Sequence, residues 1–241
     1  MGSLPTECLW HLPVAMGVIT MVATPPLRWT GMLLLLGVIL FSVATIVAEP
    51  FEQVTPLELY QAIAQYGATY QLVNYLAGLG FVLLVLSLAL VARPIPHPLR
   101  RLTLAGLSLL AIATFLWLVE VIGRLTVTTT TARQISAGAP VPTTFPATLG
   151  VGLEPLFVAF LAASLAGLAL LLWQLGQAGL FAKWLGLVSA VVIIASGSIA
   201  ALTYPWVGGV ERALFYPLVL VLLPLAFFLL LRRRPQPVRA T

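Results

Sequence analysis

Six stretches of the chain are almost continuously apolar, and each is bounded by charged, proline or polar turn residues. A helix needs about 20 apolar residues to cross a hydrocarbon core of roughly 30 Å. The stretches lack the alternation of a membrane barrel, so we interpret them as helices, which satisfy their own backbone hydrogen bonds in lipid. The pattern predicts an all-α, polytopic membrane bundle of six transmembrane helices, with spans at Trp29 to Val47, Leu72 to Val91, Leu102 to Thr126, Leu156 to Trp173, Ala182 to Leu202 and Ala213 to Leu231.

A shorter amphipathic segment lies between the first two spans. Thr55, Pro56 and Glu58 have the spacing of a helix start, in which the threonine caps the helix and the glutamate closes a capping box. Apolar residues then follow at helical spacing, namely Leu59, Ile63, Tyr66 and Tyr70. We therefore expect an outer amphipathic helix that rests its apolar face on the bundle or on lipid and leads into the second span.

The remaining segments are connections and ends. Residues 128–152 are rich in Thr, Pro and Gly, which predicts a solvated loop or a lid over the outer end of the bundle. Residues 1–26 form an N-terminal extension, and its apolar part, residues 8–24, is either an interfacial segment or a seventh span. The six-helix domain then covers residues 27–235, and residues 236–241 form a cytoplasmic tail.

Composition agrees with a membrane protein and excludes several function classes. Hydrophobic residues make up 61% of the chain and charged residues only 8%, whereas roughly a quarter of residues are charged in soluble domains. The net charge of +5 follows from membrane topology, so we expect no nucleic-acid partner. The single cysteine, Cys8, cannot form an intrachain disulfide.

The distribution of Lys and Arg predicts the orientation, because these residues stay preferentially in the cytoplasm. Only Arg124, Arg133 and Arg212 fall on one side of the predicted spans. The other side carries Arg28, Arg93, Arg100, Arg101, Lys183, Arg232, Arg233, Arg234 and Arg239. We therefore predict that the protein lies in the cell membrane with both termini in the cytoplasm. We expect the lipid bilayer to be one of its partners.

The order of these features resembles a known family. The first span is entered through Arg28, Trp29 and Gly31, an outer helix precedes the second span, the third span carries Glu120 and Arg124, and the fifth is entered through Phe181 to Val192. From residue 27 onward this resembles the bacterial integral membrane proteins of the domain of unknown function 4386 family. The resemblance implies six helices and assigns no activity. The N-terminal extension and the Thr-rich connection depart from the family pattern.

Two ionisable residues interrupt the third span. Glu120 and Arg124 are four residues apart, so they share a helix face and can form an ion pair. Glu120 lies about 28 Å along the helix from Arg101, near the outer membrane boundary, where a structural ion pair is tolerated. The functional hypothesis is an outward-facing polar pocket, in which Glu154 and Glu49 converge with this pair.

No catalytic or metal-binding pattern stands out elsewhere. The chain has two histidines and one cysteine, and its intramembrane serines have no nearby histidine for activation, so we predict no cofactor and no metal site. The leading hypothesis is a non-enzymatic accessory or structural membrane component with a membrane protein partner. The alternatives are a small-molecule or ion transporter, or a membrane enzyme acting on a lipid-like substrate, each using the outer Glu and Arg pocket.

Overall fold

A computed structural model describes residues 27–48, 51, 56–93, 95, 99–140, 154–203 and 214–231. Every regular element in these ranges is a helix, which confirms the predicted all-α class. The N-terminal extension, the proposed cap residue Thr55 and the cytoplasmic tail lie outside the described residues. The elements are α1 (Leu27–Val47), α2 (Pro56–Gln65), α3 (Gly67–Ala92), α4 (Arg100–Gly123), the π-helix η3 (Arg124–Thr128), α5 (Thr129–Ser136), α7 (Glu154–Gln177), α8 (Lys183–Thr203), the π-helix η4 (Leu218–Leu222) and α10 (Leu223–Leu231).

Within the described part of the chain, five helical stretches are long and apolar enough to cross a membrane, which indicates a membrane-embedded protein. They are Arg28–Val47, Gly67–Ala92, Arg100–Ser136, Val158–Gln177 and Leu214–Leu231. The fifth predicted span corresponds to α8, whose described apolar stretch, Lys183–Ile199, is shorter. Large apolar side chains such as Phe115 and Val158 remain about two-thirds exposed, which suits a surface in contact with lipid chains.

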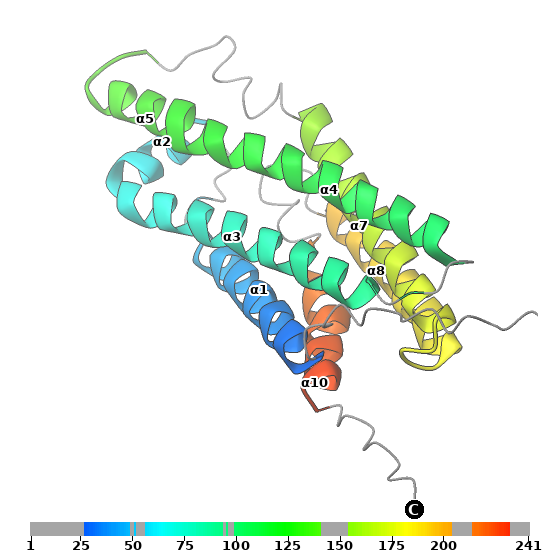
Figure 1. The fold of residues 1–241 in the computed structure, drawn as a ribbon. Helices are drawn as coiled ribbons and strands as arrows, with labels where there is room; N and C mark the ends of the chain where they lie inside the picture. Colours follow the sequence, from blue (N-terminus) through cyan, green and yellow to red (C-terminus); the bar gives the residue numbers. More distant parts are fainter. Residues whose placement is uncertain are drawn as a thin grey trace, which may run out of the picture.

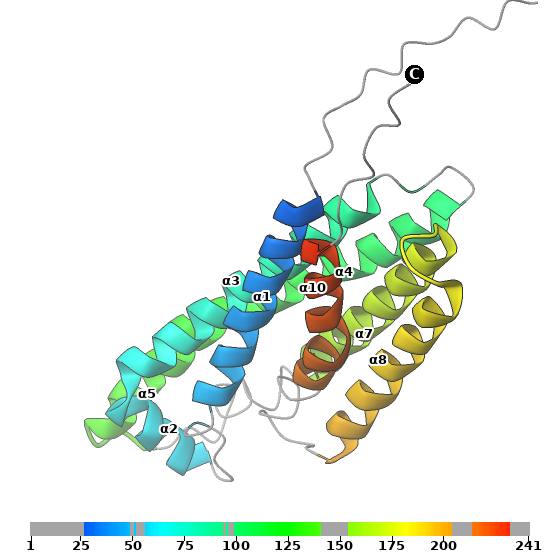
Figure 2. The same ribbon diagram turned by 90° about the horizontal axis from the view of Figure 1, so that it is seen from below.

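The long helices pack through close backbone contacts at glycines. Helix α1 lies between α3 and α10, while α4 packs on α7 and α7 on α8 (Figures 1 and 2). A Cβ atom added to Gly80 would lie 2.7 Å from the backbone nitrogen of Phe41 and 3.0 Å from the carbonyl oxygen of Gly37. Gly106 and Gly167 make the equivalent approach between α4 and α7. Such contacts between small residues are the main source of helix association in lipid, where no hydrophobic force acts between helices.

The third span is longer than predicted, and part of the predicted loop is helical. Helix α4 continues without a break through η3 into α5, so the prediction of a loop is wrong for residues 128–136. The hydroxyls of Thr126 and Thr130 each donate to the carbonyl oxygen four residues earlier, at 2.7 Å. These bonds satisfy the threonine hydroxyls within the helix itself.

The predicted amphipathic helix exists as α2, but its buried face differs from the prediction. The helix ends at Gln65, and a bend at Tyr66 leaves that side chain 47% exposed. Tyr60 is buried in its place, together with Ile63 and Tyr70. The prediction was wrong for Tyr66, which lies at the bend between the two helices, whereas Tyr60 and Ile63, three residues apart on α2, pack against Ala132 of α5.

Helix α2 packs mainly on α5 and also contacts α3. Tyr60, Ile63 and Tyr70 form a small apolar cluster with Ala132 of α5, separate from the main core. Both helices lie together at one end of the molecule (Figures 1 and 2). We call residues 56–70 and 129–140 the α2–α5 cap.

Candidate functional site

The predicted pairing of Glu120 and Arg124 is confirmed. Arg124 Nε donates a hydrogen bond to Glu120 Oε1 at 2.7 Å, a short distance typical of a charge-assisted bond. The side chain of Arg124 is 14% exposed and that of Glu120 is 10% exposed. The two opposite charges therefore neutralise each other in a largely dehydrated place at the end of α4.

The ion pair rests on an aromatic surface. The guanidinium carbon of Arg124 lies 5.5 Å from the centroid of the Trp117 ring, within the range of a cation–π interaction. Trp117 precedes Glu120 by three residues and Arg124 by seven, so all three side chains lie on one face of the helix. The ring of Trp117 is fully buried, and its contact with Arg124 fixes where the guanidinium can lie.

Four aromatic rings from four helices form a closed circuit beneath the pair. Trp117 of α4 stacks on Phe160 of α7 with centroids 4.9 Å apart and planes 19° apart. Phe160 meets Phe81 of α3 edge-on at 5.3 Å. Phe41 of α1 lies 6.2 Å from Phe81 and 6.0 Å from Trp117. This aromatic quartet is buried in all four members and joins α1, α3, α4 and α7 at one level.

Some buried polar side chains of the bundle bond within their own helices, whereas Trp117 Nε1, Ser42 Oγ and Ser164 Oγ have no hydrogen-bond partner among the described residues. Asn74 donates to the carbonyl oxygen of Tyr70 at 2.8 Å, and Thr45 donates to that of Phe41 at 3.0 Å. Ser87 likewise donates to the carbonyl of Leu84 at 2.7 Å. Because each bond stays within one helix, these groups do not form a continuous polar path between helices.

The helix changes its hydrogen-bond register at the ion pair. Arg124 is the first residue of the π-helix η3, and the hydroxyl of Thr129 donates to the Arg124 carbonyl oxygen at 3.1 Å. Short π segments are uncommon and are frequent at functional sites. The widened turn separates the apolar part of the span from the polar, threonine-rich part that continues into the cap.

The other two predicted site residues stay predictions. Glu154 is the first residue of α7, but its side chain is outside the described part of the structure. Glu49 is not among the described residues. Sequence reasoning missed Trp117 as a member of the site, although its spacing from Glu120 and Arg124 was a sufficient signal. The other three rings come from different helices, so no local pattern could have indicated them.

Among the described residues, no group of three His, Cys, Asp or Glu side chains could hold a metal ion. Comparisons with protein-family models, curated proteins and solved structures found no match, so the likeness to the domain of unknown function 4386 family stays a prediction.

Proposed function

We propose that the chain is a six-helix integral protein of the cell membrane that acts as a non-enzymatic accessory or structural component. Helix α8 supplies the sixth span, since it is 21 residues long and packs on α7 along the bundle. The uneven distribution of Lys and Arg supports cytoplasmic termini, with the α2–α5 cap on the outer side. The resemblance of the span entries to a bacterial six-helix family supports the same architecture.

The aromatic quartet is the observation that carries this proposal. A transporter needs polar or broken helix segments that line a path near the bilayer midplane. Here four large rings close the space between α1, α3, α4 and α7. Leu84, Leu110 and Leu168, all with no exposed surface, continue the apolar core. A bundle packed in this way supports a dry interior with its interaction surfaces on the outside.

The ion pair fits the same role as a structural element. An acid or base in an enzyme must be available to its substrate. Glu120 instead accepts a 2.7 Å hydrogen bond from Arg124, and the arginine is also held against Trp117. We infer that the pair fixes the end of α4 and positions the cap, with the lipid bilayer and a membrane protein as partners.

Cysteine accessibility tests the dry interior. Ser87 and Ser164 have no exposed surface and lie on α3 and α7, and Ser→Cys is a nearly isosteric change. In a background in which Cys8 is replaced by alanine, Ser87→Cys and Ser164→Cys should resist a hydrophilic maleimide in native membranes and react only after denaturation in SDS. Ala137→Cys, on the exposed end of the cap, is the control that must react without SDS. Labelling of either buried position in native membranes would refute the proposal in favour of a water-filled path.

The same background tests the topology. A cysteine at His97, between the second and third spans, and a cysteine at Ala137 should react with an impermeant reagent from opposite sides of the membrane. Reaction of both from one side would overturn the six-helix topology, whereas the labelling of Ser87→Cys and Ser164→Cys bears only on the interior.

A further inference from the structure

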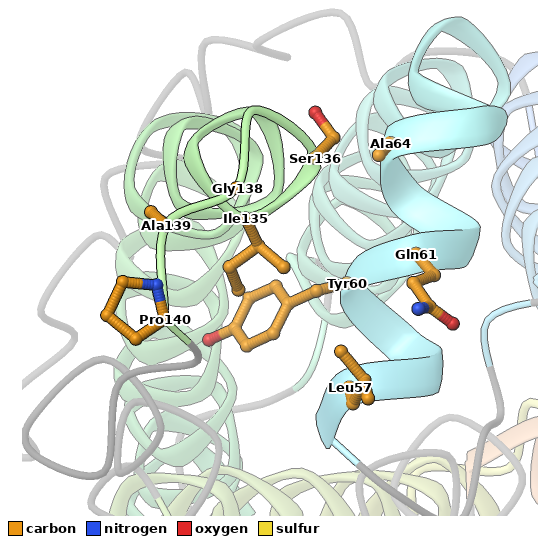
Figure 3. Close-up of a pocket in the computed structure, with 9 residues that line it drawn as sticks. All are labelled: Leu57, Tyr60, Gln61, Ala64, Ile135, Ser136, Gly138, Ala139 and Pro140. Atoms are coloured by element: carbon orange, nitrogen blue, oxygen red, sulfur yellow. The ribbon is translucent and has the colours of Figure 1, made fainter.

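A pocket lies within the α2–α5 cap, away from the ion pair and the aromatic quartet. It has a volume of about 480 Å³ and is partly open to the surface. One wall comes from α2 and the other from the end of α5 with the turn that follows it (Figure 3). Sites for small molecules have volumes of roughly 300–1,000 Å³, so the pocket is large enough for a compact organic ligand.

The inner wall is rigid and apolar. The ring of Tyr60 and the side chain of Ile135 lie next to each other in the centre of the pocket (Figure 3). Tyr60 is only 5% exposed, and it belongs with Ile63 and Ala132 to the apolar cluster that joins the two helices. A ligand would therefore meet a preformed surface, since the packing of α2 on α5 already holds both residues.

The opposite rim is a hydrogen-bonded turn. Gly138 has a φ of +94°, a left-handed conformation that glycine adopts readily, and it ends α5. Its amide donates to the carbonyl oxygen of Ile135 at 3.0 Å, and the amide of Ala139 donates to that of Gln134 at 3.0 Å. The turn brings Ala139 and Pro140 to the edge of the pocket facing Tyr60 (Figure 3).

The lining defines the chemistry of the ligand. Tyr60, Ile135 and Pro140 offer flat or apolar surfaces, whereas Gln61 and Ser136 offer a side-chain amide and a hydroxyl. Among the described residues, no charged side chain lines the pocket. A charged ligand would lose hydration without gaining an ion partner, so the lining favours an uncharged molecule.

We propose that the pocket of the α2–α5 cap is a binding site for a small, uncharged, planar ring compound that carries one hydrogen-bonding group. The ring lies in the pocket against the apolar surface of Ile135 and Pro140, and the polar group faces Gln61 or Ser136. This activity is additional to the structural role proposed above and does not depend on it, because the pocket shares no residue with the ion pair or the aromatic quartet.

The probe for this site is 5-fluoroindole, which is planar, neutral and has one N–H donor. Its fluorine resonance is followed by NMR with the full-length protein in nanodiscs, and empty nanodiscs measure its partition into lipid. We expect broadening that saturates with concentration beyond the lipid background. The anionic 5-fluoroindole-2-carboxylate should bind about tenfold more weakly or worse, because its carboxylate would lose water without a charged partner.

Two substitutions fill the pocket from opposite walls. Ala64→Phe extends from α2 and Ser136→Phe from α5, and both positions are exposed, so neither disturbs the core. Each should abolish saturable binding while keeping the thermal midpoint of the parent protein. Ala68→Phe is the matched control, since Ala68 is exposed at the start of α3 and does not line the pocket.

Loss of saturable binding in both filled variants and its retention in Ala68→Phe support the site. Broadening that never exceeds the empty nanodiscs, or saturable binding that survives both filled variants, overturns it. Equal binding of the carboxylate would contradict the assigned ligand class. If Ala64→Phe alone fails to fold, Ser136→Phe still decides the outcome from the other wall.

Discussion

Removing one partner of the Glu120 and Arg124 pair should destabilise the protein more than removing both. The perturbation is a double-mutant cycle built from Glu120→Gln, Arg124→Gln and their combination. Glutamine keeps much of the side-chain volume in both cases but removes the charge. Each single variant leaves a mostly buried charge beside a neutral group, while the double variant leaves two neutral groups that can still hydrogen bond.

The magnitude follows from the exposure of the pair. Exposed pairs contribute about 0–1 kcal/mol, and breaking a fully buried pair costs about 3–5 kcal/mol. With side chains only 14% and 10% exposed, we expect each single substitution to lower the free energy of unfolding by about 2–3 kcal/mol. Arg124→Gln should be the worse of the two, because it also removes the contact with Trp117, which contributes about 0.5–2 kcal/mol.

The double variant should lose about 1–2 kcal/mol, so the coupling energy should be on the order of 2–5 kcal/mol. Thermal and SDS unfolding of the four proteins in the same detergent measure it. Arg133→Gln provides the control, because Arg133 is exposed and lies about 20 Å further along the helix from Glu120. Its effect should add to that of Glu120→Gln. Additive effects between Glu120 and Arg124 would refute the structural role of the pair.

Two further predictions concern packing and pH. Gly80→Ala should destabilise the bundle by about 1–3 kcal/mol in an SDS unfolding assay, because its Cβ would meet the backbone nitrogen of Phe41 at 2.7 Å. Gly67→Ala, which has open space around it, should be neutral or stabilising by up to about 1 kcal/mol, and equal losses at both sites would contradict the packing argument. Burial raises the pKa of Tyr60 above its usual 10.0, so the neutral phenol is favoured in the folded cap. The stability due to this neutral form is present below about pH 10 and is lost as the pH rises through the higher pKa of the folded state. Hydrogen exchange in the cap should therefore increase above about pH 10 by more than the intrinsic exchange rate does. The Tyr60→Phe variant, which has no phenol to ionise, should not show this extra increase.

The sequence was a good guide to what depends on local spacing. Continuous apolar stretches predicted the helical class, because only a helix satisfies all the backbone hydrogen bonds of an isolated segment in lipid. The spacing of Glu120 and Arg124 also predicted their pairing, because residues four positions apart lie on the same face of a helix. The extent of the third helix was not predictable in this way, since Thr129–Ser136 packs on α2 through Ala132, a contact between segments that are distant in the chain.

Contacts between distant segments could not be predicted from one sequence. Gly37 gave no sign that it would meet Gly80, because glycine is frequent in membrane helices for several reasons. The rings that surround Trp117 come from three other helices, and their meeting depends on how those helices cross. The pocket beside Tyr60 depends on the packing of α2 against the end of α5, and these segments are far apart in the chain.

The contact between α10 and α1 constrains the order in which the protein can assemble during synthesis. A Cβ on Gly31 would lie 3.0 Å from the backbone nitrogen of Leu230, so the first described helix carries a groove shaped for the last. Helices α1 and α3 can pair early, since they follow each other closely in the chain. The Gly31 face of α1 has no packing partner until residues 214–231 have been inserted into the membrane. During that interval the face is accessible to lipid, to a chaperone or to a helix of another protein.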